Sequence, residues 1–270
     1  MSIFDKFRLD GKRALITGGS RGLGRAMAQA LAEAGADLVL VGREETNLKV
    51  AAQELSALTD KSTVDSKVSG RRVDFLPADM STPGEADRAC REVLAKYGPI
   101  HILINNVGGR RINIPTEQMP TEEWLRILDL NLTSAFVCSK LIGAEMVKRR
   151  SGRIINVASI SGMIVNRGIH GRSYETSKAA LVAFTKTLAV DWAPYNVTVN
   201  AIAPGGFLTD PNRRWFREMP ELKTTFESMV PMGRLGEPDE IGPLALYLAS
   251  DASSYMTGAT VVIDGGYTLW

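Results

Sequence analysis

The strongest indication of fold in this sequence is the regular alternation of short apolar segments with helical segments. Continuous apolar runs of this length that alternate with helices are typical of a parallel sheet covered on both faces. The predicted strands span residues 13–17, 38–41, 73–77, 100–104, 153–157, 197–202 and 259–263, and the helices between them span 23–34, 45–58, 85–97, 121–150, 174–193 and 237–248. We therefore expect an α/β fold, a doubly wound parallel sheet of about seven strands flanked by helices.

The length of 270 residues is compatible with one domain, because α/β units often reach this size. No internal repeat or interdomain linker interrupts the pattern. Residues 59–70 are polar, and we interpret them as an exposed loop. Residues 207–233 are the least regular part of the chain, and we predict an irregular substrate lid there, since mobile segments often close over a site.

The composition argues against several classes of function. The net charge of +2, from 32 basic and 30 acidic residues, provides no strong field for nucleic acid or an anionic membrane. Two cysteines are too few for a secreted disulfide scaffold, and no Cys, His or Asp cluster has metal-ligand spacing. We find no signal peptide and no uncharged apolar stretch of about 18 residues. We expect a cytoplasmic protein without a metal.

A glycine-rich turn follows the first predicted strand in the sequence Thr17-Gly18-Gly19-Ser20-Arg21-Gly22-Leu23-Gly24. Glycine allows the backbone to turn sharply and approach a pyrophosphate, and the following helix offers free N–H groups and positive potential. The spacing is G-x-x-x-G-x-G instead of the common G-x-G-x-x-G. The alternative is a plain tight loop, which the strand–turn–helix context makes the weaker interpretation.

That spacing resembles the short-chain dehydrogenase/reductase family, and further elements in the same order extend the resemblance over essentially the whole chain. These elements are Asp79, Asn105-Asn106-Val107-Gly108 (Ala in place of Val in the family), Tyr174-x-x-x-Lys178, and Pro204-Gly205 followed by Thr209. The resemblance implies a single Rossmann-type catalytic domain over residues 1–270, a nicotinamide cofactor, and hydride transfer between an alcohol and a carbonyl. It also implies that Asp79 contacts the adenine amino group.

Tyr174 and Lys178 carry the predicted acid–base chemistry. They are four residues apart, so they share one face of a helix. A free phenol has a pKa of about 10 and is a poor base at neutral pH. A nearby ammonium favours the phenolate and lowers that pKa, which lets the phenol exchange a proton with a substrate oxygen. An isolated Tyr-x-x-x-Lys pair would more often lie on the surface of a helix without a catalytic role. The other family elements in this sequence argue against that interpretation.

Two more residues complete the predicted catalytic set of Asn131, Ser159, Tyr174 and Lys178. Ser159 follows the fifth strand, where ligands of α/β sheets bind, and its hydroxyl could bond the reacting oxygen. Ser161 is a rival, but the family's Ser-x-x-Gly pattern with Gly162 favours Ser159. Asn131 lies among apolar helix residues and should point inward, where a buried amide needs partners. The resemblance implies that Asn131 holds a water that links Lys178 to solvent.

The end of the second strand indicates the cofactor. NAD-binding proteins usually place an acidic residue there, whereas an arginine suits the 2′-phosphate of NADP. Here the strand ends at Gly42-Arg43, and Asp37 lies at its other end. We favour NADP. NAD stays the alternative, because the acidic residues Glu44 and Glu45 follow at once and weaken the inference. The predicted cofactor-binding residues are Gly18, Ser20, Arg21, Gly22, Leu23, Gly24, Arg43, Asp79, Met80, Asn106, Gly108, Tyr174, Lys178, Pro204, Gly205, Leu208 and Thr209.

The terminal segments Phe7–Lys12 and Asp264–Thr268 look most like the gluconate 5-dehydrogenase branch of the family. We therefore expect a secondary alcohol of a sugar acid or polyol as substrate, with a 3-oxoacyl-carrier-protein reductase as the alternative. A non-catalytic cofactor-binding regulator is a third possibility, against which the complete catalytic set argues. Basic residues near the predicted mouth could bind a carboxylate, namely Arg110, Arg111, Arg167 and Arg172. The resemblance also implies a homotetramer formed through the long helices.

Five conspicuous side chains have less specific interpretations. His101 lies in a strand and should be structural, whereas His170 precedes Tyr174 in a loop and could touch the substrate. Trp215 and Phe216 lie in the predicted lid and either cover the substrate or pack. Trp270 is expected at a subunit contact.

Overall fold

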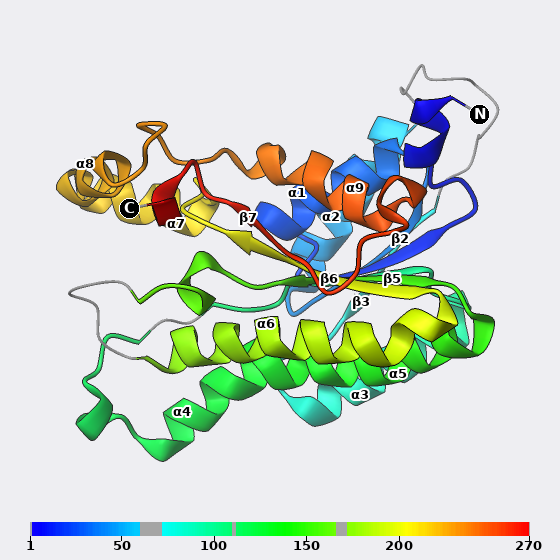
Figure 1. Cartoon of the computed structure of the whole chain (residues 1–270), viewed down its shortest axis with the longest axis horizontal. Helices are drawn as coiled ribbons and strands as arrows, with labels where there is room; N and C mark the ends of the chain where they lie inside the picture. The colour runs from blue at the N-terminus through cyan, green and yellow to red at the C-terminus, as the bar shows by residue number, and fades with distance from the viewer. Residues whose placement is uncertain (1, 60–71, 110–111, 166–171, 270) are drawn as a thin grey trace.

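The computed structural model describes residues 2–59, 72–109, 112–165 and 172–269, and it contains one sheet of seven parallel strands (Figure 1). The strand order is β3-β2-β1-β4-β5-β6-β7. The strands are β1 Arg13–Thr17, β2 Asp37–Gly42, β3 Val73–Pro77, β4 Ile102–Asn105, β5 Gly152–Val157, β6 Val197–Pro204 and β7 Thr260–Ile263. The predicted α/β class, the doubly wound Rossmann-type arrangement and the number of strands are confirmed.

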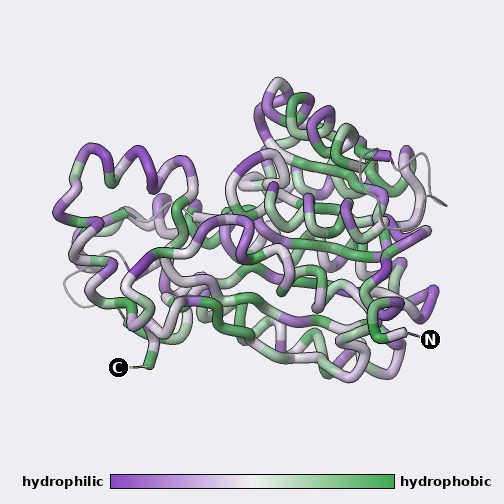
Figure 2. The backbone as a smooth tube through the Cα atoms, turned by 90° about the horizontal axis from the view of Figure 1, so that it is seen from above, coloured by the Kyte–Doolittle hydropathy of each residue, from purple (hydrophilic) through white to green (hydrophobic). Residues whose placement is uncertain are grey.

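Helices cover both faces of the sheet, as Figure 1 shows. One layer holds α1 Gly22–Glu33, α2 Glu45–Thr59 and α9 Gly242–Ala249, and the other holds α3 Pro83–Tyr97, α4 Thr121–Leu128, α5 Ser134–Arg149 and α6 Ser173–Trp192. Each layer buries its own apolar core against the sheet. Figure 2 shows the same division, with hydrophobic backbone along the strands and hydrophilic stretches on the outer helices. Burial on both faces explains the apolar runs of central strands such as β1 and β2.

The chain reverses its direction of strand addition between β1 and β4, which are neighbours in the sheet. In open α/β sheets this reversal leaves a crevice outside the carboxyl ends of the two strands, because the following segments diverge to opposite faces. Gly18 follows β1 at this edge, and Asn106 follows β4. The topology therefore brings the two glycine-containing motifs of the sequence together.

The predicted long helix of residues 121–150 is interrupted by one π-helical turn, Asp129–Thr133, between α4 and α5. Asn131 interferes with regular α-helical hydrogen bonding at this turn, because its side-chain Nδ2 donates to the Ile127 carbonyl at 2.9 Å. A side chain that bonds the carbonyl four residues back competes with the regular helical ladder. By length and composition the run Thr121–Arg149 could cross a membrane, but half of its most apolar window is buried inside the fold, as expected of a core helix.

The prediction of an irregular segment over 207–233 was wrong, because this segment contains α7 Asp210–Glu218 and α8 Pro220–Ser228. Helix α7 is short and mostly polar and buries only Phe216, so its sequence offers too few apolar positions to identify a helix. Trp215, Phe216 and Phe226 pack together, with ring centroids 5.3 to 6.0 Å apart.

The predicted helix of 237–248 also differs in detail. It begins as a 3₁₀ turn over Pro238–Ile241, and α9 starts only at Gly242. The polar loop predicted over residues 59–70 lies almost wholly outside the described residues.

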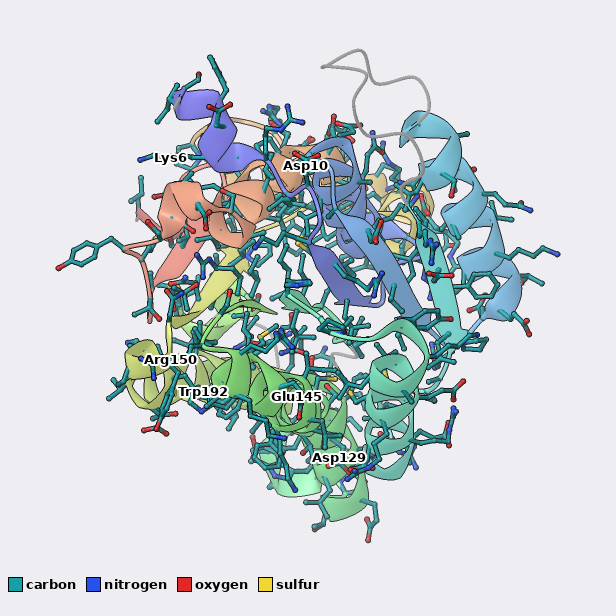
Figure 3. The ribbon with its side chains drawn as sticks, turned by 90° about the vertical axis from the view of Figure 1, so that its right-hand side faces the viewer. Lys6, Asp10, Asp129, Glu145, Arg150 and Trp192 are labelled. Carbon is teal, nitrogen blue, oxygen red and sulfur yellow. The ribbon has the colours of Figure 1, made fainter. Side chains whose placement is uncertain are left out.

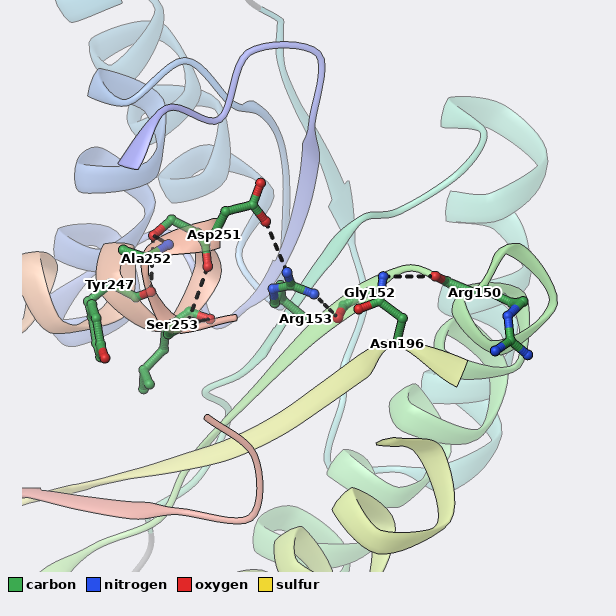
Figure 4. Close-up of polar contacts among 10 residues, drawn as sticks. Arg150, Gly152, Arg153, Asn196, Tyr247, Asp251, Ala252 and Ser253 are labelled. Carbon is green, nitrogen blue, oxygen red and sulfur yellow. Dashed lines mark hydrogen bonds and ion pairs between the residues drawn. The ribbon is translucent and has the colours of Figure 1, made fainter. Parts of the chain in front are cut away.

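The amino ends of the strands are fastened by polar contacts far from the crevice. His101 Nδ1 accepts the Arg13 backbone N–H at 3.0 Å, which agrees with a structural role, and Asp37 pairs with the Arg13 guanidinium at 3.1 Å. Arg153 pairs with Asp251 at 3.0 Å, as Figure 4 shows.

The two long helices α5 and α6 pack closely against each other. Gly143 of α5 leaves no room for a side chain, since a Cβ there would lie 2.3 Å from the Trp192 ring of α6. Figure 3 shows Trp192 and Glu145 on this pair of helices. Cys90 and Cys138 are buried free thiols on α3 and α5.

Candidate active site

The glycine-rich turn between β1 and α1 adopts a conformation that only glycine accommodates easily. Gly18 and Gly22 have φ angles of +66° and +55°, in the left-handed region. Gly24 is required by a close approach, since a Cβ there would lie 2.2 Å from the Gly18 carbonyl oxygen. Helix α1 begins without a side-chain cap, so its first N–H groups face the crevice.

The turn after β4 is fastened to the glycine-rich turn by hydrogen bonds. The Thr17 hydroxyl accepts the backbone N–H groups of Asn106 and Val107 at 2.9 and 3.1 Å. The Asn106 amide donates in return to the carbonyl oxygens of Thr17 and Gly18 at 3.0 and 3.2 Å. The two motifs therefore form one rigid floor, although 89 positions separate Thr17 from Asn106 in the sequence.

A cavity of about 660 Å³ opens over this floor. It extends from the glycine-rich turn, past the ends of β2 and β3, to Tyr174 and the start of α7. Its lining contains all predicted cofactor-binding residues except Leu208, together with Ser159. The Leu208 side chain packs instead against the apolar cluster of Phe216, Val230 and Leu235, so its position does not support a cofactor contact.

Lys178 is the central buried charge of the site. Its side chain is 3% exposed, and its Nζ donates to the Val157 carbonyl oxygen at 2.8 Å. The same nitrogen lies 5.9 Å from the centre of the Tyr174 ring. Burial lowers the pKa of the Lys178 ammonium to about 8, because a low-dielectric environment disfavours the charged form.

Gly108 and Asn131 complete the surroundings of Lys178. A Cβ at Gly108 would lie 2.8 Å from both Lys178 Nζ and Asn131 Oδ1, so only glycine leaves room for them. Asn131 is fully buried, as predicted, and exchanges two hydrogen bonds with Gly109, at 2.8 Å to its N–H and 3.0 Å to its carbonyl. The π-helical turn thus places Asn131 directly behind the cavity floor, although it does not line the cavity.

Ser159 faces the cavity, and its rival Ser161 does not. The Ser159 Oγ accepts the Ser161 backbone N–H at 3.1 Å and caps a 3₁₀ turn, Ile160–Gly162. Gly162 lets this turn approach α6, since a Cβ there would lie 2.7 Å from the Lys178 backbone. The structure therefore places Ser159, Tyr174 and Lys178 around one end of the cavity.

Arg21, Arg43 and Glu44 lie at the opposite end of the cavity, beyond β2. Arg21 and Glu44 are half-exposed and their charged groups are 4.0 Å apart, so this pair is weak. Asp79 faces the cavity and accepts hydrogen bonds from the backbone and hydroxyl of Ser81 at 3.0 and 2.7 Å.

Sequence reasoning missed several residues that line the cavity, namely Gly42, Asn47, Ala78, Ser81, Gly109, Arg126, Leu130, Val157, Ala158, Pro211 and Asn212. Most of them lie next in the sequence to residues that were identified. Their position directly after the end of a strand was the signal that could have found them. Arg126 and Leu130 lie on α4 and in the π-helical turn, and no signal in the sequence points to them.

Other predicted residues have different outcomes. Arg172 pairs with Glu175 at 3.5 Å instead of lining the cavity. Arg110, Arg111, Arg167, His170 and Trp270 lie outside the described residues. In the described parts of the chain, no group of three His, Cys, Asp or Glu side chains could hold a metal ion.

The cavity fits a dinucleotide. A glycine-rich turn at an uncapped helix N-terminus suits a pyrophosphate, because backbone N–H groups can bond its oxygens directly. Arg43 and Asp79 line one end of the cavity, and Tyr174 and Ser159 line the other. These features define a dinucleotide-dependent oxidoreductase.

Comparisons with known proteins agree. The family described as enoyl-(acyl carrier protein) reductase matches residues 18–268. Galactitol 2-dehydrogenase (L-tagatose-forming) of Cereibacter sphaeroides is 41% identical over 266 residues, which are 98% of each chain. A 2-dehydro-3-deoxy-D-gluconate 5-dehydrogenase of Pseudoalteromonas atlantica is 38% identical over 98% of this chain and 99% of its own.

A solved structure is similarly close. The 3-oxoacyl-(acyl-carrier-protein) reductase of Agrobacterium tumefaciens, with NADP bound, aligns with a TM-score of 0.88 and 32% identity over 99% of this chain and 98% of its own. The chain belongs to the short-chain dehydrogenase/reductase family, as its motifs predict, and it is an oxidoreductase acting on CH–OH groups.

The buried lysine generates a prediction for cofactor binding. Below pH 8 Lys178 carries its charge, and above pH 8 it loses it in the free protein. Because an anionic dinucleotide favours the ammonium, the Kd for NADPH should rise above pH 8, by at most about tenfold per pH unit. Fluorescence titration between pH 7 and 9.5 measures this dependence.

Lys178→Met should bind NADPH more weakly and lose the break at pH 8. Lys186→Met is the matched control, since Lys186 is an exposed lysine on the same helix. A wild-type Kd that is constant over this pH range, or a break that persists in Lys178→Met, would contradict the role of the buried ammonium.

Proposed function

We propose that this protein interconverts a secondary alcohol of a polyol or sugar acid and the corresponding ketone, with NADP as its preferred cofactor. The observation that carries the proposal is the buried Lys178 ammonium beside Tyr174, at the end of a cavity that begins at a glycine-rich helix N-terminus. Such an arrangement holds a tunable phenol next to the reactive end of a bound dinucleotide.

The bound nicotinamide supplies or accepts the hydride at the substrate carbon. In reduction Tyr174 donates its phenolic proton to the carbonyl oxygen, and in oxidation it takes the proton of the alcohol. Ser159 orients that oxygen through its hydroxyl, which the 3₁₀ turn holds toward the cavity. Lys178 lowers the pKa of the Tyr174 phenol and holds the cofactor ribose, and Asn131 organises the path by which the proton reaches solvent.

The substrate class is supported by relatives that act on galactitol and on a 3-deoxy sugar acid, each over nearly the full length of this chain. The cavity wall agrees, since polar groups converge on its reactive end. The alternative, reduction of a 3-oxoacyl group on a carrier protein, has support from the structural similarity to such a reductase.

Replacement of Tyr174 by Phe should remove nearly all turnover, because no other described side chain at that end of the cavity donates a phenolic proton. Cofactor affinity should stay within about twofold, since the ring and Lys178 remain. Turnover is measured spectrophotometrically with polyols, sugar acids and β-ketoesters, with both cofactors, and Tyr255→Phe serves as an exposed control. Full activity in Tyr174→Phe would contradict the mechanism.

The same substrate panel decides between the candidate functions. Turnover of polyols or sugar acids supports the proposal, and turnover only of β-ketoesters supports the carrier-protein reductase. Tight cofactor binding with no turnover of any substrate would support a regulator that only binds the cofactor.

The preference for NADP is proposed from the charges beyond β2. Arg43 lines the cavity directly after the strand, and Arg21 lies nearby with only a weak pair to Glu44. An arginine fork suits a phosphate, whereas an acidic residue would suit a free 2′-hydroxyl.

Arg43→Ala should therefore raise the Kd for NADPH by roughly tenfold or more, with a much smaller effect on NADH, because only NADPH carries the phosphate. Parallel titrations of the two cofactors measure the ratio. Arg91→Ala on the distant α3 is the control. An equal loss of both affinities would show that Arg43 does not select the cofactor.

We also propose that the protein is a cytoplasmic homotetramer assembled through α5 and α6. Apolar side chains are exposed along this layer, with Leu125 53%, Phe136 46% and Val190 76% exposed. Exposed apolar patches of this kind often mark contacts between subunits. Both cysteines are buried free thiols, which suits a reducing compartment.

Light scattering should therefore give four chain masses for the wild type and a smaller assembly for Val190→Glu, because a carboxylate in an apolar interface is costly to bury. Val50→Glu, at an exposed valine on α2, should leave the tetramer intact. A monomeric wild type, or equal behaviour of the two variants, would contradict this assembly.

A further inference from the structure

Four buried polar side chains lie one layer behind the cavity, between the sheet and the helix pair α5 and α6. They come from four different elements: Asn105 from the end of β4, Asn156 from β5, Ser139 from α5 and Thr185 from α6. None is more than 3% exposed. Polar groups at this depth are costly unless they bond one another.

These side chains are joined in one chain of hydrogen bonds. Asn105 and Asn156 lie opposite each other in the sheet, and Asn105 Nδ2 donates to Asn156 Oδ1 at 2.8 Å. The same Nδ2 lies 3.1 Å from Ser139 Oγ. Asn156 Nδ2 donates to Thr185 Oγ1 at 2.9 Å, and that hydroxyl donates to the Leu181 carbonyl at 2.8 Å.

The network connects the elements that carry the acid–base residues. Helix α6 carries Tyr174 and Lys178, and the π-helical turn that leads into α5 carries Asn131. Asn156 immediately precedes Val157, whose carbonyl oxygen accepts the Lys178 ammonium. Asn105 immediately precedes the turn that contains Gly108, which contacts both Lys178 and Asn131.

Stability alone does not account well for this network. Asn105 Oδ1 has no hydrogen-bond partner among the residues that the structure describes, so the network is incompletely satisfied there. Apolar side chains of similar volume would fill the same space without this cost. Hydrogen bonds are directional, whereas apolar contacts are not. The network can therefore hold each helix at one position along the strands.

We infer that Asn105, Asn156, Ser139 and Thr185 form a positioning network that sets the placement of Lys178 and Asn131 relative to Tyr174. None of the four lines the cavity, and they act only through the helices and strands that they join. The inference rests on the proposed acid–base roles of Tyr174 and Lys178.

Thr185→Val tests the network, because valine keeps the shape of threonine and loses the hydroxyl. We expect kcat to fall roughly ten- to hundredfold, since small misplacements of reacting groups are costly. The KM for the cofactor should change less than about twofold. The pH break in NADPH binding should move above 8, because looser packing admits water to the Lys178 ammonium.

Thr198→Val is the matched control. Thr198 is also a buried threonine, on β6, and within the described parts of the chain its hydroxyl has no hydrogen-bond partner. It should leave kcat and the pH break unchanged. All rates are measured under conditions in which urea unfolding shows that each variant is folded. A Thr185→Val variant with wild-type kcat and an unmoved pH break would overturn the inference.

The double variant Asn156→Val/Thr185→Val separates positioning from stability. It removes both partners of the Asn156–Thr185 bond, so no unsatisfied donor remains from that bond, and Asn105 Nδ2 keeps the Ser139 hydroxyl as its acceptor. Urea unfolding measures the stability of the double variant beside its kcat. A positioning role requires that kcat stay low even so. If kcat returns to the wild-type value, the network is only structural.

The failure of this inference can be told from a failure of the proposed function. If Tyr174→Phe abolishes turnover and Thr185→Val does not reduce it, only the network's role is wrong. If Tyr174→Phe is fully active, the acid–base assignment is wrong, and the network has nothing to position.

Discussion

A single lysine ammonium kept almost out of contact with water is the constraint on which the rest of the site depends. Burial lowers the pKa of the Lys178 ammonium to about 8, and the Val157 carbonyl accepts a hydrogen bond from it at 2.8 Å. The ammonium also needs space, which the absence of a side chain at Gly108 provides. The charge and the space together account for the spacing of the sequence motifs around Tyr174.

The sheet topology makes this arrangement possible by joining segments that are distant in the sequence. Reversal of strand order between β1 and β4 places the glycine-rich turn next to the Asn106 turn, and Thr17 and Asn106 bond them. Strand β5 then delivers Val157 and Ser159 to the same edge. A dinucleotide bound at the glycine-rich turn would therefore extend toward Tyr174 along an already rigid floor.

Much of the fold and the main site residues could be predicted from the sequence, because they depend on local patterns. Buried strands such as β2 are continuously apolar over residues 38–41, and the Tyr174–Lys178 spacing is fixed by helix geometry. Helix α7 escaped prediction because only Phe216 is buried on it. The π-helical turn depends on a side chain that competes with the backbone for a hydrogen bond. The contact of Asn156 with Thr185 depends on the packing of distant segments, and no local sequence pattern indicates either feature.

The central claim is that the Lys178 ammonium makes Tyr174 a usable acid–base group. Selective ¹³C labelling of tyrosine Cζ, with the Tyr174 signal assigned from Tyr174→Phe, follows the ionisation of this phenol directly by NMR. We expect Tyr174 to ionise at a lower pH in the wild type than in Lys178→Met, since the cation favours the phenolate. Ionisation at the same pH in both proteins would show that Lys178 does not tune this phenol.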